Sequence, residues 1–123
     1  MVHTEMFTIT KDFAFSASHQ LSRLPETHQC ARLHGHNYAV RVELSAADLD
    51  AHNFVRDYGE LAALKAHIDD TLDHRHLNDV YGHDAVTAEF LAKALYDWCA
   101  ARWPETSAVA VSETPKTWAI YRP

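Results

Sequence analysis

The stretch His34-Gly-His-Asn-Tyr-Ala-Val-Arg-Val-Glu-Leu44 contains the clearest secondary-structure signal in the chain. Apolar side chains occupy every second position from Tyr38 to Leu44, and mostly polar ones stand between them. This period of two is typical of a strand with one buried face. His34 and His36 are also two residues apart, so if they continue this strand, both imidazoles lie on the same face.

The residues before this stretch predict a second strand and a long connection. Phenylalanine and isoleucine alternate with polar or small residues over Phe7–Phe15, which indicates another half-buried strand. An irregular segment from Ser16 to Leu33 joins the two strands. A connection of this length in a small domain is usually functional.

The second half of the chain predicts two helices and a hairpin. Apolar residues recur at spacings of three and four after Tyr58, with Asp57 as a plausible helix cap: Leu61, Leu64, Ile68 and Leu72. A second helix is expected from Thr87, after a polar connection over Asp73–Ala85. Two β-prone runs close the chain as a hairpin: Ala108–Thr114 and Thr117–Tyr121.

These elements predict a single α+β domain over residues 1–123. We expect a four-stranded antiparallel sheet with two helices on one face. Such a sheet has two open edges, and open edges favour pairing with another copy of the chain. Self-association is therefore expected from the element order alone.

Composition excludes several classes of protein. The chain has 123 residues, 47% apolar and 23% charged, which is the balance of a globular protein. No apolar run approaches the roughly 20 residues of a membrane helix, and no secretory signal is evident. The net charge of −6 argues against nonspecific nucleic-acid binding. Two cysteines are too few for a disulfide scaffold, so a cytoplasmic location is expected.

Histidine is the unusual residue, with ten in the chain. His34 and His36 are expected on one strand face, and His19 falls just past the end of the predicted first strand. Three neutral imidazoles with an open fourth position are typical of a catalytic zinc site. The alternative is that these are surface and loop histidines that never meet, but a third histidine at a strand end favours the metal site.

The sequence surroundings of the two cysteines predict different roles for them. Cys30 lies in a polar segment four residues before His34, where nearby positive charge would favour the reactive thiolate. Cys99 lies beside Trp98 on the second predicted helix and fits the more common role of a buried apolar residue.

Other titratable residues have competing interpretations. Asp73-His74 could be a carboxylate-oriented imidazole that transfers protons, or a helix end at which the imidazole complements the dipole. His76 is an equal candidate by spacing. Glu89 is explained by a helix start alone. Glu113 lies in an otherwise apolar strand and should pair, for instance with a planar ligand group that presents two parallel donors.

The ordered set of motifs resembles one family. The motifs are Phe15-Ser-Ala-Ser-His19, Cys30-Ala-Arg-Leu-His-Gly-His-Asn-Tyr38, Leu72-Asp-His74 with Leu77-Asn78, Thr87-Ala-Glu89 and Ser112-Glu-Thr114. Together they resemble the 6-pyruvoyl-tetrahydropterin synthase superfamily, and within it the bacterial 6-carboxy-5,6,7,8-tetrahydropterin synthase branch. The resemblance runs from about Phe7 to Arg122. Val86 departs from it, because the family often has proline there.

The resemblance implies a tunnelling fold assembled as a homohexamer of two trimers. It implies Zn²⁺ on His19, His34 and His36, Cys30 as catalytic base, and Asp73 with His74 as a proton relay. Glu113 would anchor a pterin, with Thr87 and Glu89 helping across a subunit interface. The implied substrate is 7,8-dihydroneopterin triphosphate, whose phosphates would need positively charged side chains. The candidates are Lys11, Arg32, Arg41 and Lys116.

The implied activity is a zinc-dependent lyase reaction that gives 6-carboxy-5,6,7,8-tetrahydropterin, acetaldehyde and triphosphate, as in queuosine and deazapurine biosynthesis. One alternative is 6-pyruvoyl-tetrahydropterin synthase activity, without acetaldehyde release. Another is a non-catalytic, zinc-stabilised oligomeric module in which Cys30 closes the metal site. A zinc hydrolase is disfavoured, since no acid near His34 or His36 in sequence could activate a metal-bound water.

Overall fold

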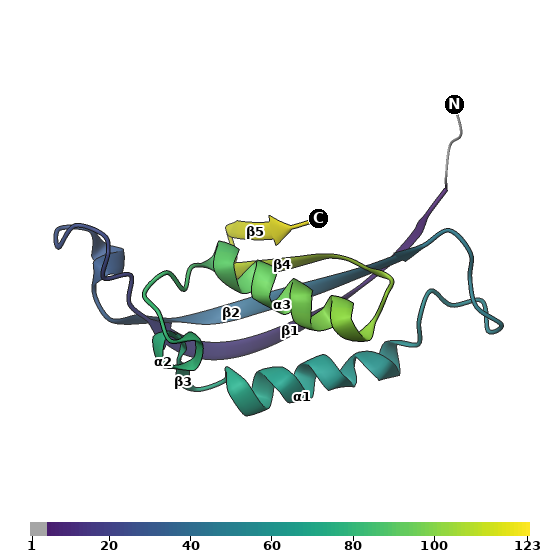
Figure 1. Ribbon diagram of the computed structural model, residues 1–123, viewed down its shortest axis with the longest axis horizontal. Coiled ribbons are helices and arrows are strands. Elements are labelled where there is room, and N and C mark those ends of the chain that lie inside the picture. The colour runs from purple at the N-terminus through teal and green to yellow at the C-terminus, as the bar shows by residue number, and fades with distance from the viewer. Residues whose placement is uncertain (1–4) are drawn as a thin grey trace.

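A computed structural model describes residues 5–123, which form one mixed sheet and the helices that cover it (Figure 1). The strands stand in the order β3-β1-β2-β4-β5. Their bounds are β1 Phe7–His19, β2 His34–Ala46, β3 Arg75–His76, β4 Thr106–Thr114 and β5 Thr117–Tyr121. One of the ten histidines, His3, lies outside the described residues.

The predicted four-stranded antiparallel sheet is correct for β1, β2, β4 and β5, but it omits a fifth strand. β3 pairs in parallel with β1 at Ala17 and Ser18, so the sheet is mixed. A two-residue strand is too short to show an alternating pattern. It forms because the backbone N–H and C=O of Ser16 bind Asp73 and His74, which directly precede β3.

β1 is also longer than predicted. It continues past Phe15 to His19, because Ala17 and His19 extend the series of buried odd-numbered positions. The connection to β2 is therefore shorter than the predicted Ser16–Leu33 segment. It contains one 3₁₀ turn, η1 (Gln29–Ala31), and lies beyond one end of the sheet (Figure 1).

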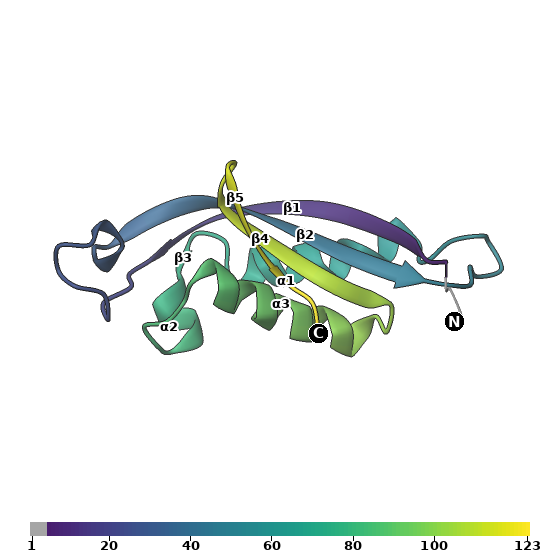
Figure 2. The same ribbon diagram turned by 90° about the horizontal axis from the view of Figure 1, so that it is seen from above.

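Both predicted helices are present and lie on the same face of the sheet (Figure 2). Their bounds are α1 Ala62–Thr71 and α3 Ala88–Arg102, and the 3₁₀ turn η2 Tyr58–Leu61 leads into α1. Asp57 caps that turn through the N–H of Gly59, as predicted. A short helix, α2 (Leu77–Tyr81), was not predicted; it buries Leu77 and ends at Gly82, whose φ of 74° is left-handed.

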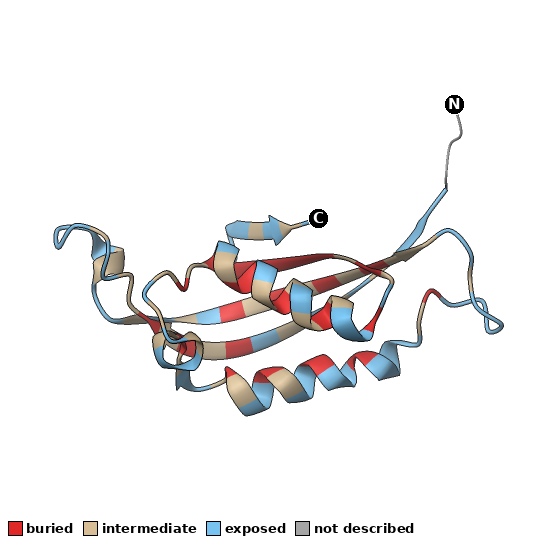
Figure 3. Ribbon diagram, viewed as in Figure 1, coloured by how far each residue is buried: buried red, intermediate tan, exposed pale blue. Residues whose placement is uncertain are grey.

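The core lies between the sheet and the two long helices (Figure 3). The alternating residues of β2 face it, each at most 1% exposed: Tyr38, Val40, Val42 and Leu44. Leu64 and Ile68 come from α1, and Leu91 and Leu95 from α3. Each such aliphatic side chain contributes about 1.5–3 kcal/mol by leaving water. Within the described residues, no helix is both long and apolar enough to cross a membrane.

The register of β1 against β2 determines where the candidate site lies. His19 pairs with His34, and Ala17 pairs with His36, at the end of the sheet that carries the 20–33 connection. Because side chains alternate across a strand, these histidines share the helix-facing side, whereas Ser16 and Ser18 face away from it.

Candidate metal centre and active site

Three histidines from two strands meet at the end of the sheet. The rings of His19, His34 and His36 have centroids 4.4, 5.1 and 4.9 Å apart. One nitrogen of each lies within 4.8 Å of the others, so the group could hold a metal ion. The prediction that these imidazoles converge is confirmed, and the alternative of scattered histidines is wrong.

Backbone carbonyls determine which nitrogens are free. Nδ1 of His19 lies 2.7 Å from the carbonyl oxygen of Val86, and Nδ1 of His34 lies 2.6 Å from that of Arg32. A carbonyl only accepts, so both rings carry their proton on Nδ1 and present a lone pair at Nε2. The Nε2 atoms of all three histidines are buried without a hydrogen-bond partner.

This arrangement fits a metal ion. Imidazole nitrogen is a good zinc ligand, and a ligating histidine normally donates its other N–H to a carbonyl or carboxylate. Burial lowers the pKa of His19, and the neighbouring His34 lowers it further, against the hydrogen bond to Val86. Burial also lowers the pKa of His36, against the charge of Glu113. Neutral rings are the form that binds metal.

Two backbone features support the triad. The side chain of Val86 is fully buried, and its carbonyl holds His19, a role that proline could also fill. The departure from the family motif therefore leaves this contact intact. Gly35 allows a close approach of the strands and does not serve an unusual φ, since a Cβ there would lie 3.3 Å from the carbonyl oxygen of Ala17, which is a tight contact.

Glu113 on β4 lies next to the histidine triad and also lines a cavity. Its Oε2 lies 3.5 Å from Nε2 of His36. Glu113 and Glu89 line one cavity of about 390 Å³ between β4, β5 and the start of α3, with Trp118 at its wall. Thr87 is the N-cap of α3, and its side-chain oxygen accepts the N–H of Phe90 at 3.1 Å. One chain therefore brings both acids to one cavity.

Asp73 and His74 form the predicted pair at the open edge of β1. Oδ2 of Asp73 lies 3.0 Å from Nδ1 of His74, and Oδ1 accepts the N–H of Ser16 at 2.9 Å. These hydrogen bonds, first from Ser16 and then from His74, lower the pKa of Asp73. His74 has a left-handed φ of 60°, which few residues other than glycine adopt. Its side chain is 82% exposed.

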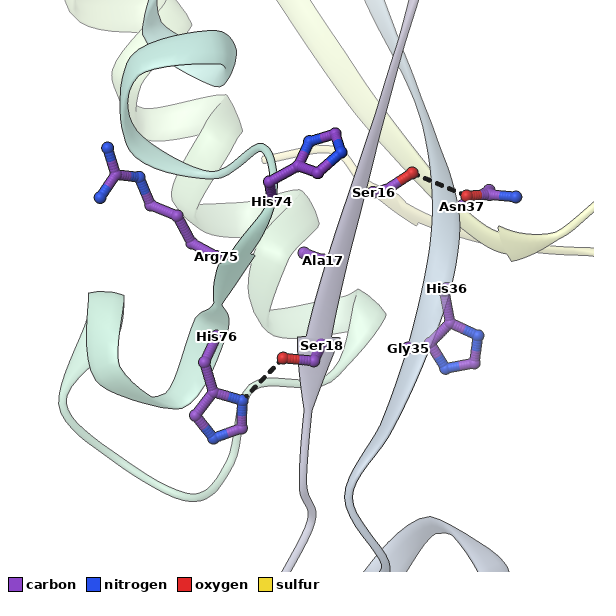
Figure 4. Close-up of a pocket in the computed structure, with 9 residues that line it drawn as sticks. All are labelled: Ser16, Ala17, Ser18, Gly35, His36, Asn37, His74, Arg75 and His76. Atoms are coloured by element: carbon purple, nitrogen blue, oxygen red, sulfur yellow. Dashed lines mark hydrogen bonds between the residues drawn. The ribbon is translucent and has the colours of Figure 1, made fainter.

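A cavity of about 470 Å³ lies beside this pair (Figure 4). His74 and His76 stand on one side of it, and Ser16 and Ser18 stand on β1. Nδ1 of His76 lies 3.0 Å from Oγ of Ser18. Spacing could not separate His74 from His76; the structure places both at this cavity and pairs only His74 with an adjacent carboxylate.

Cys30 lies in the 3₁₀ turn η1 and is half-buried. The turn is tied to the two residues that follow His19, because Leu21 N–H donates to the Cys30 carbonyl and Gln20 Nε2 donates to the Ala31 carbonyl, both at 3.0 Å. Among the residues that the structure describes, the group that could hold a metal comprises the three histidines without Cys30. Cys99 is buried on α3, as predicted.

Several supporting groups had no signal in the sequence. The carbonyls of Val86 and Arg32 and the N–H of Ser16 are backbone groups, and every residue type supplies the carbonyl and all except proline the N–H. Ser18 and His76 come together only through the parallel pairing of β3 with β1. Only the polar positions on the outward face of β1 could have indicated Ser16 and Ser18.

Comparison with known sequences identifies relatives along the whole chain. The profile of the family described as 6-pyruvoyl tetrahydropterin synthase matches residues 8–123. The 6-carboxy-5,6,7,8-tetrahydropterin synthase of Bacillus subtilis (strain 168) is 32% identical over 130 aligned positions, covering 98% of this chain and 88% of the relative. The protein of that name from Synechocystis sp. is 35% identical, covering 74% of this chain and 73% of the relative.

Solved structures share the fold. A 6-pyruvoyl tetrahydropterin synthase from Caenorhabditis elegans has a TM-score of 0.83 at 25% identity, covering 100% of this chain and 99% of that chain. The corresponding Plasmodium falciparum protein has a TM-score of 0.76 at 14% identity, covering 96% of this chain and 98% of that one, which shows the fold alone. The family fold expected from the motifs is confirmed, whereas the fifth strand, the mixed pairing and the short helix α2 differ from the prediction.

Proposed function

The chain belongs to the 6-pyruvoyl tetrahydropterin synthase family and is an enzyme of its lyase type, and from this premise we propose its reaction. The single domain over residues 1–123 converts 7,8-dihydroneopterin triphosphate and water to 6-carboxy-5,6,7,8-tetrahydropterin, acetaldehyde and triphosphate. The names of the two bacterial relatives support the carboxy product. The product would enter queuosine or related deazapurine biosynthesis.

The observation that carries the proposal is the group of three buried, unpartnered Nε2 atoms of His19, His34 and His36. We propose that these atoms hold Zn²⁺. The ion supplies, when bound, a Lewis acid that polarises substrate oxygen atoms. The chain itself contributes the fixed tautomers of His19 and His34, which keep the lone pairs directed at one point without any rearrangement.

Proton transfer is assigned to Cys30, Asp73 and His74. The thiolate of Cys30 takes the proton from the substrate carbon, since a thiolate is the reactive form of cysteine. Asp73 holds the proton of His74 on Nδ1, which leaves Nε2 of His74 to exchange protons. The imidazole of His74 is 82% exposed, which suits a group that acts in a site completed by a neighbouring subunit.

Pterin binding is assigned to Glu113, Glu89 and Thr87. A carboxylate matches the two parallel N–H donors of the amino-pyrimidinone edge, and Glu113 is the carboxylate beside the histidine triad. Glu89 shares its cavity, and Thr87 caps the helix that carries Glu89.

We also propose that the chain assembles as a homohexamer of two trimers. Both edges of the sheet support self-association. β3 pairs with β1 only at Ala17 and Ser18, which leaves the outer edge of β1 without a strand from Phe7 to Phe15 within the described residues. β5 forms the other edge. Light scattering on the purified protein should give the mass of six chains, and the mass of one chain would contradict this assembly.

The test of the reaction is incubation of the zinc-loaded protein with 7,8-dihydroneopterin triphosphate, followed by mass spectrometry of the products. We expect 6-carboxy-5,6,7,8-tetrahydropterin and acetaldehyde in equal amounts. A matched His34→Ala variant should bind no zinc and form neither product. His52→Ala, which alters an exposed histidine outside the triad, should behave as the wild type.

The other outcomes would change the assignment. A pyruvoyl product without acetaldehyde would make the chain a 6-pyruvoyl-tetrahydropterin synthase, which is the activity named for the Caenorhabditis elegans neighbour. Stoichiometric zinc without turnover would favour a non-catalytic module. The separation of Cys30 from the group of possible metal ligands argues against a closed structural site of that kind.

A further inference from the structure

Tyr38 carries a buried hydroxyl with no hydrogen-bond partner. The residue is 1% exposed and stands on β2 directly beyond the histidine triad. Buried hydroxyls are normally paired, because a donor removed from water without a partner costs free energy. Phenylalanine would fill the same space without that cost, so the hydroxyl requires an explanation.

The ring of Tyr38 is held in one position. It stacks on Phe15 with centroids 4.9 Å apart and planes 11° apart. The edges of His36 and His19 close two further sides, at centroid distances of 5.4 and 6.1 Å. A ring packed in this way cannot turn to reach a distant partner, so the partner of its hydroxyl must be a close neighbour.

The register of β2 against β4 brings Glu113, which can accept a hydrogen bond, to the position across from Tyr38. Ala39 pairs with Ser112 and Val40 with Val111, so the register continued by one residue places Tyr38 opposite Glu113. Cross-strand neighbours on one face have Cβ atoms about 4.5–5.5 Å apart. Burial raises the pKa of Tyr38, and the charge of Glu113 raises it further, consistent with proximity.

Glu113 needs a donor when the triad holds a metal. Its carboxylate now lies 3.5 Å from Nε2 of His36 and could pair with that nitrogen only if it were protonated. A nitrogen that binds a metal carries no proton. That nitrogen would then offer Glu113 no N–H, and the free O–H of Tyr38 is a donor across the strand.

We propose that Tyr38 is a positioning residue, whose hydroxyl donates to the Glu113 carboxylate and so orients it toward the amino-pyrimidinone edge of a pterin. This inference rests on the proposed function. Tyr38 acts through Glu113 and touches neither the reacting atoms nor the triphosphate. It therefore affects pterin binding more than the chemical steps.

The test compares Tyr38→Phe with the wild type in the zinc-loaded, full-length protein. The probe is pterin itself, which has the amino-pyrimidinone edge without the reactive side chain, and its binding is followed by fluorescence. We expect the Kd for pterin to rise about tenfold, as for loss of a hydrogen bond to a charged group. With 7,8-dihydroneopterin triphosphate, KM should rise by a similar factor while kcat stays within about twofold.

Tyr96→Phe is the matched control. The hydroxyl of Tyr96 on α3 donates to the carbonyl of Thr106 at 3.3 Å and so has a partner that the hydroxyl of Tyr38 lacks. Its loss should lower Tm and leave pterin binding unchanged. Tyr38→Phe should do the reverse: Tm and zinc content stay at or above the wild-type values, because no existing hydrogen bond is lost.

A double mutant tests whether the effect passes through Glu113. In a Glu113→Ala background, Tyr38→Phe should cause no further loss of pterin binding. Independent, additive losses would overturn the proposal, as would unchanged pterin binding by Tyr38→Phe or a loss of zinc or Tm in that variant. If the wild type itself neither binds pterin nor turns over the triphosphate, the proposed function fails together with the inference.

Discussion

At the scale of single residues, backbone carbonyls decide what the histidines can do. An imidazole has two nitrogens, and a metal ligand must present a lone pair at the correct one. The carbonyls of Val86 and Arg32 settle this for His19 and His34 before any ion arrives. The sequence identifies the three histidines that could hold a metal, and the fold selects the tautomers of His19 and His34.

Cys30→Ala should abolish turnover and leave zinc bound. The thiol supplies the proposed base, while the group that could hold the metal comprises the three histidines alone among the described residues. Product formation by mass spectrometry and zinc content by atomic absorption measure the two effects separately. Loss of zinc in this variant would refute the role given to Cys30.

Cys99→Ala is the control for that experiment. Cys99 is buried on α3, where burial raises the pKa of its thiol to about 12, so it is an inert apolar residue. The substitution should retain activity and lower the free energy of unfolding by about 1 kcal/mol through the small cavity that it leaves.

Asp73→Asn should remove one source of acid sensitivity. The N–H of Ser16 and the imidazole of His74 lower the pKa of the folded Asp73 below its ordinary value of 3.8. A lowered carboxyl pKa stabilises the fold above the unfolded pKa, and that stability is lost as the pH falls through the folded pKa. We expect urea unfolding from pH 6 to pH 2 to give a higher free energy of unfolding for the wild type than for the variant, and this difference should shrink below about pH 4. A constant difference across this range would contradict the assignment.

At the scale of elements, the pairing of β1 with β2 brings the three histidines together. The register places His19 opposite His34 and puts His36 on the same face. A slip of one residue would turn His19 to the opposite face from the other two, because side chains alternate along a strand. The apolar alternation of both strands prevents this slip, since it would expose the core residues of one of them.

The start of α3 has a structural role that can be separated from substrate binding. The side chain of Thr87 accepts the N–H of Phe90 and caps the helix that carries Glu89. Thr87→Ala should therefore lower the free energy of unfolding by about 1 kcal/mol. Thr87→Ser, which keeps the capping oxygen, should unfold within a few tenths of a kcal/mol of the wild type in urea. If both variants were equally stable, Thr87 would not be a cap.

At the scale of the whole molecule, the helices cover only one face of the sheet (Figure 2). The other face carries an ion pair between Asp12 and Arg41, with Arg41 5.0 Å from the ring centroid of Trp118. Trp118 and Ile120 on β5 are exposed. A sheet closed into a barrel has no free edges. This sheet keeps an open edge at β1 and one face without helices.

Metal should stabilise the folded molecule. A ligand that binds only the native state adds about 2.7 kcal/mol at a concentration 100 times its Kd. For a chain of this length, zinc at that concentration should raise Tm by roughly 10 °C. The shift should disappear on chelation and in His36→Ala, and it should persist in His52→Ala. Stabilisation that survives in His36→Ala would place the metal elsewhere.

The sequence by itself was sufficient to predict the features that depend on local patterns along the chain. Alternation predicted β1 and β2, two β-prone runs predicted the hairpin of β4 and β5, and apolar periodicity predicted α1 and α3. Histidines two apart on a strand predicted that His34 and His36 share a face, because the period of a strand is a local property. The family followed from the ordered motifs, which the comparisons confirm.

Only the tertiary structure decided features that depend on contacts between distant segments. β3 is two residues long and forms because Asp73 and His74 bind the edge of β1 at Ser16. The lone pair of His19 is set by the carbonyl of Val86, 67 residues away. Tyr38 shows its unpaired hydroxyl only once β2 and β4 are in register. Backbone groups are alike in every residue except proline, so their partners are determined by the packing of the whole chain.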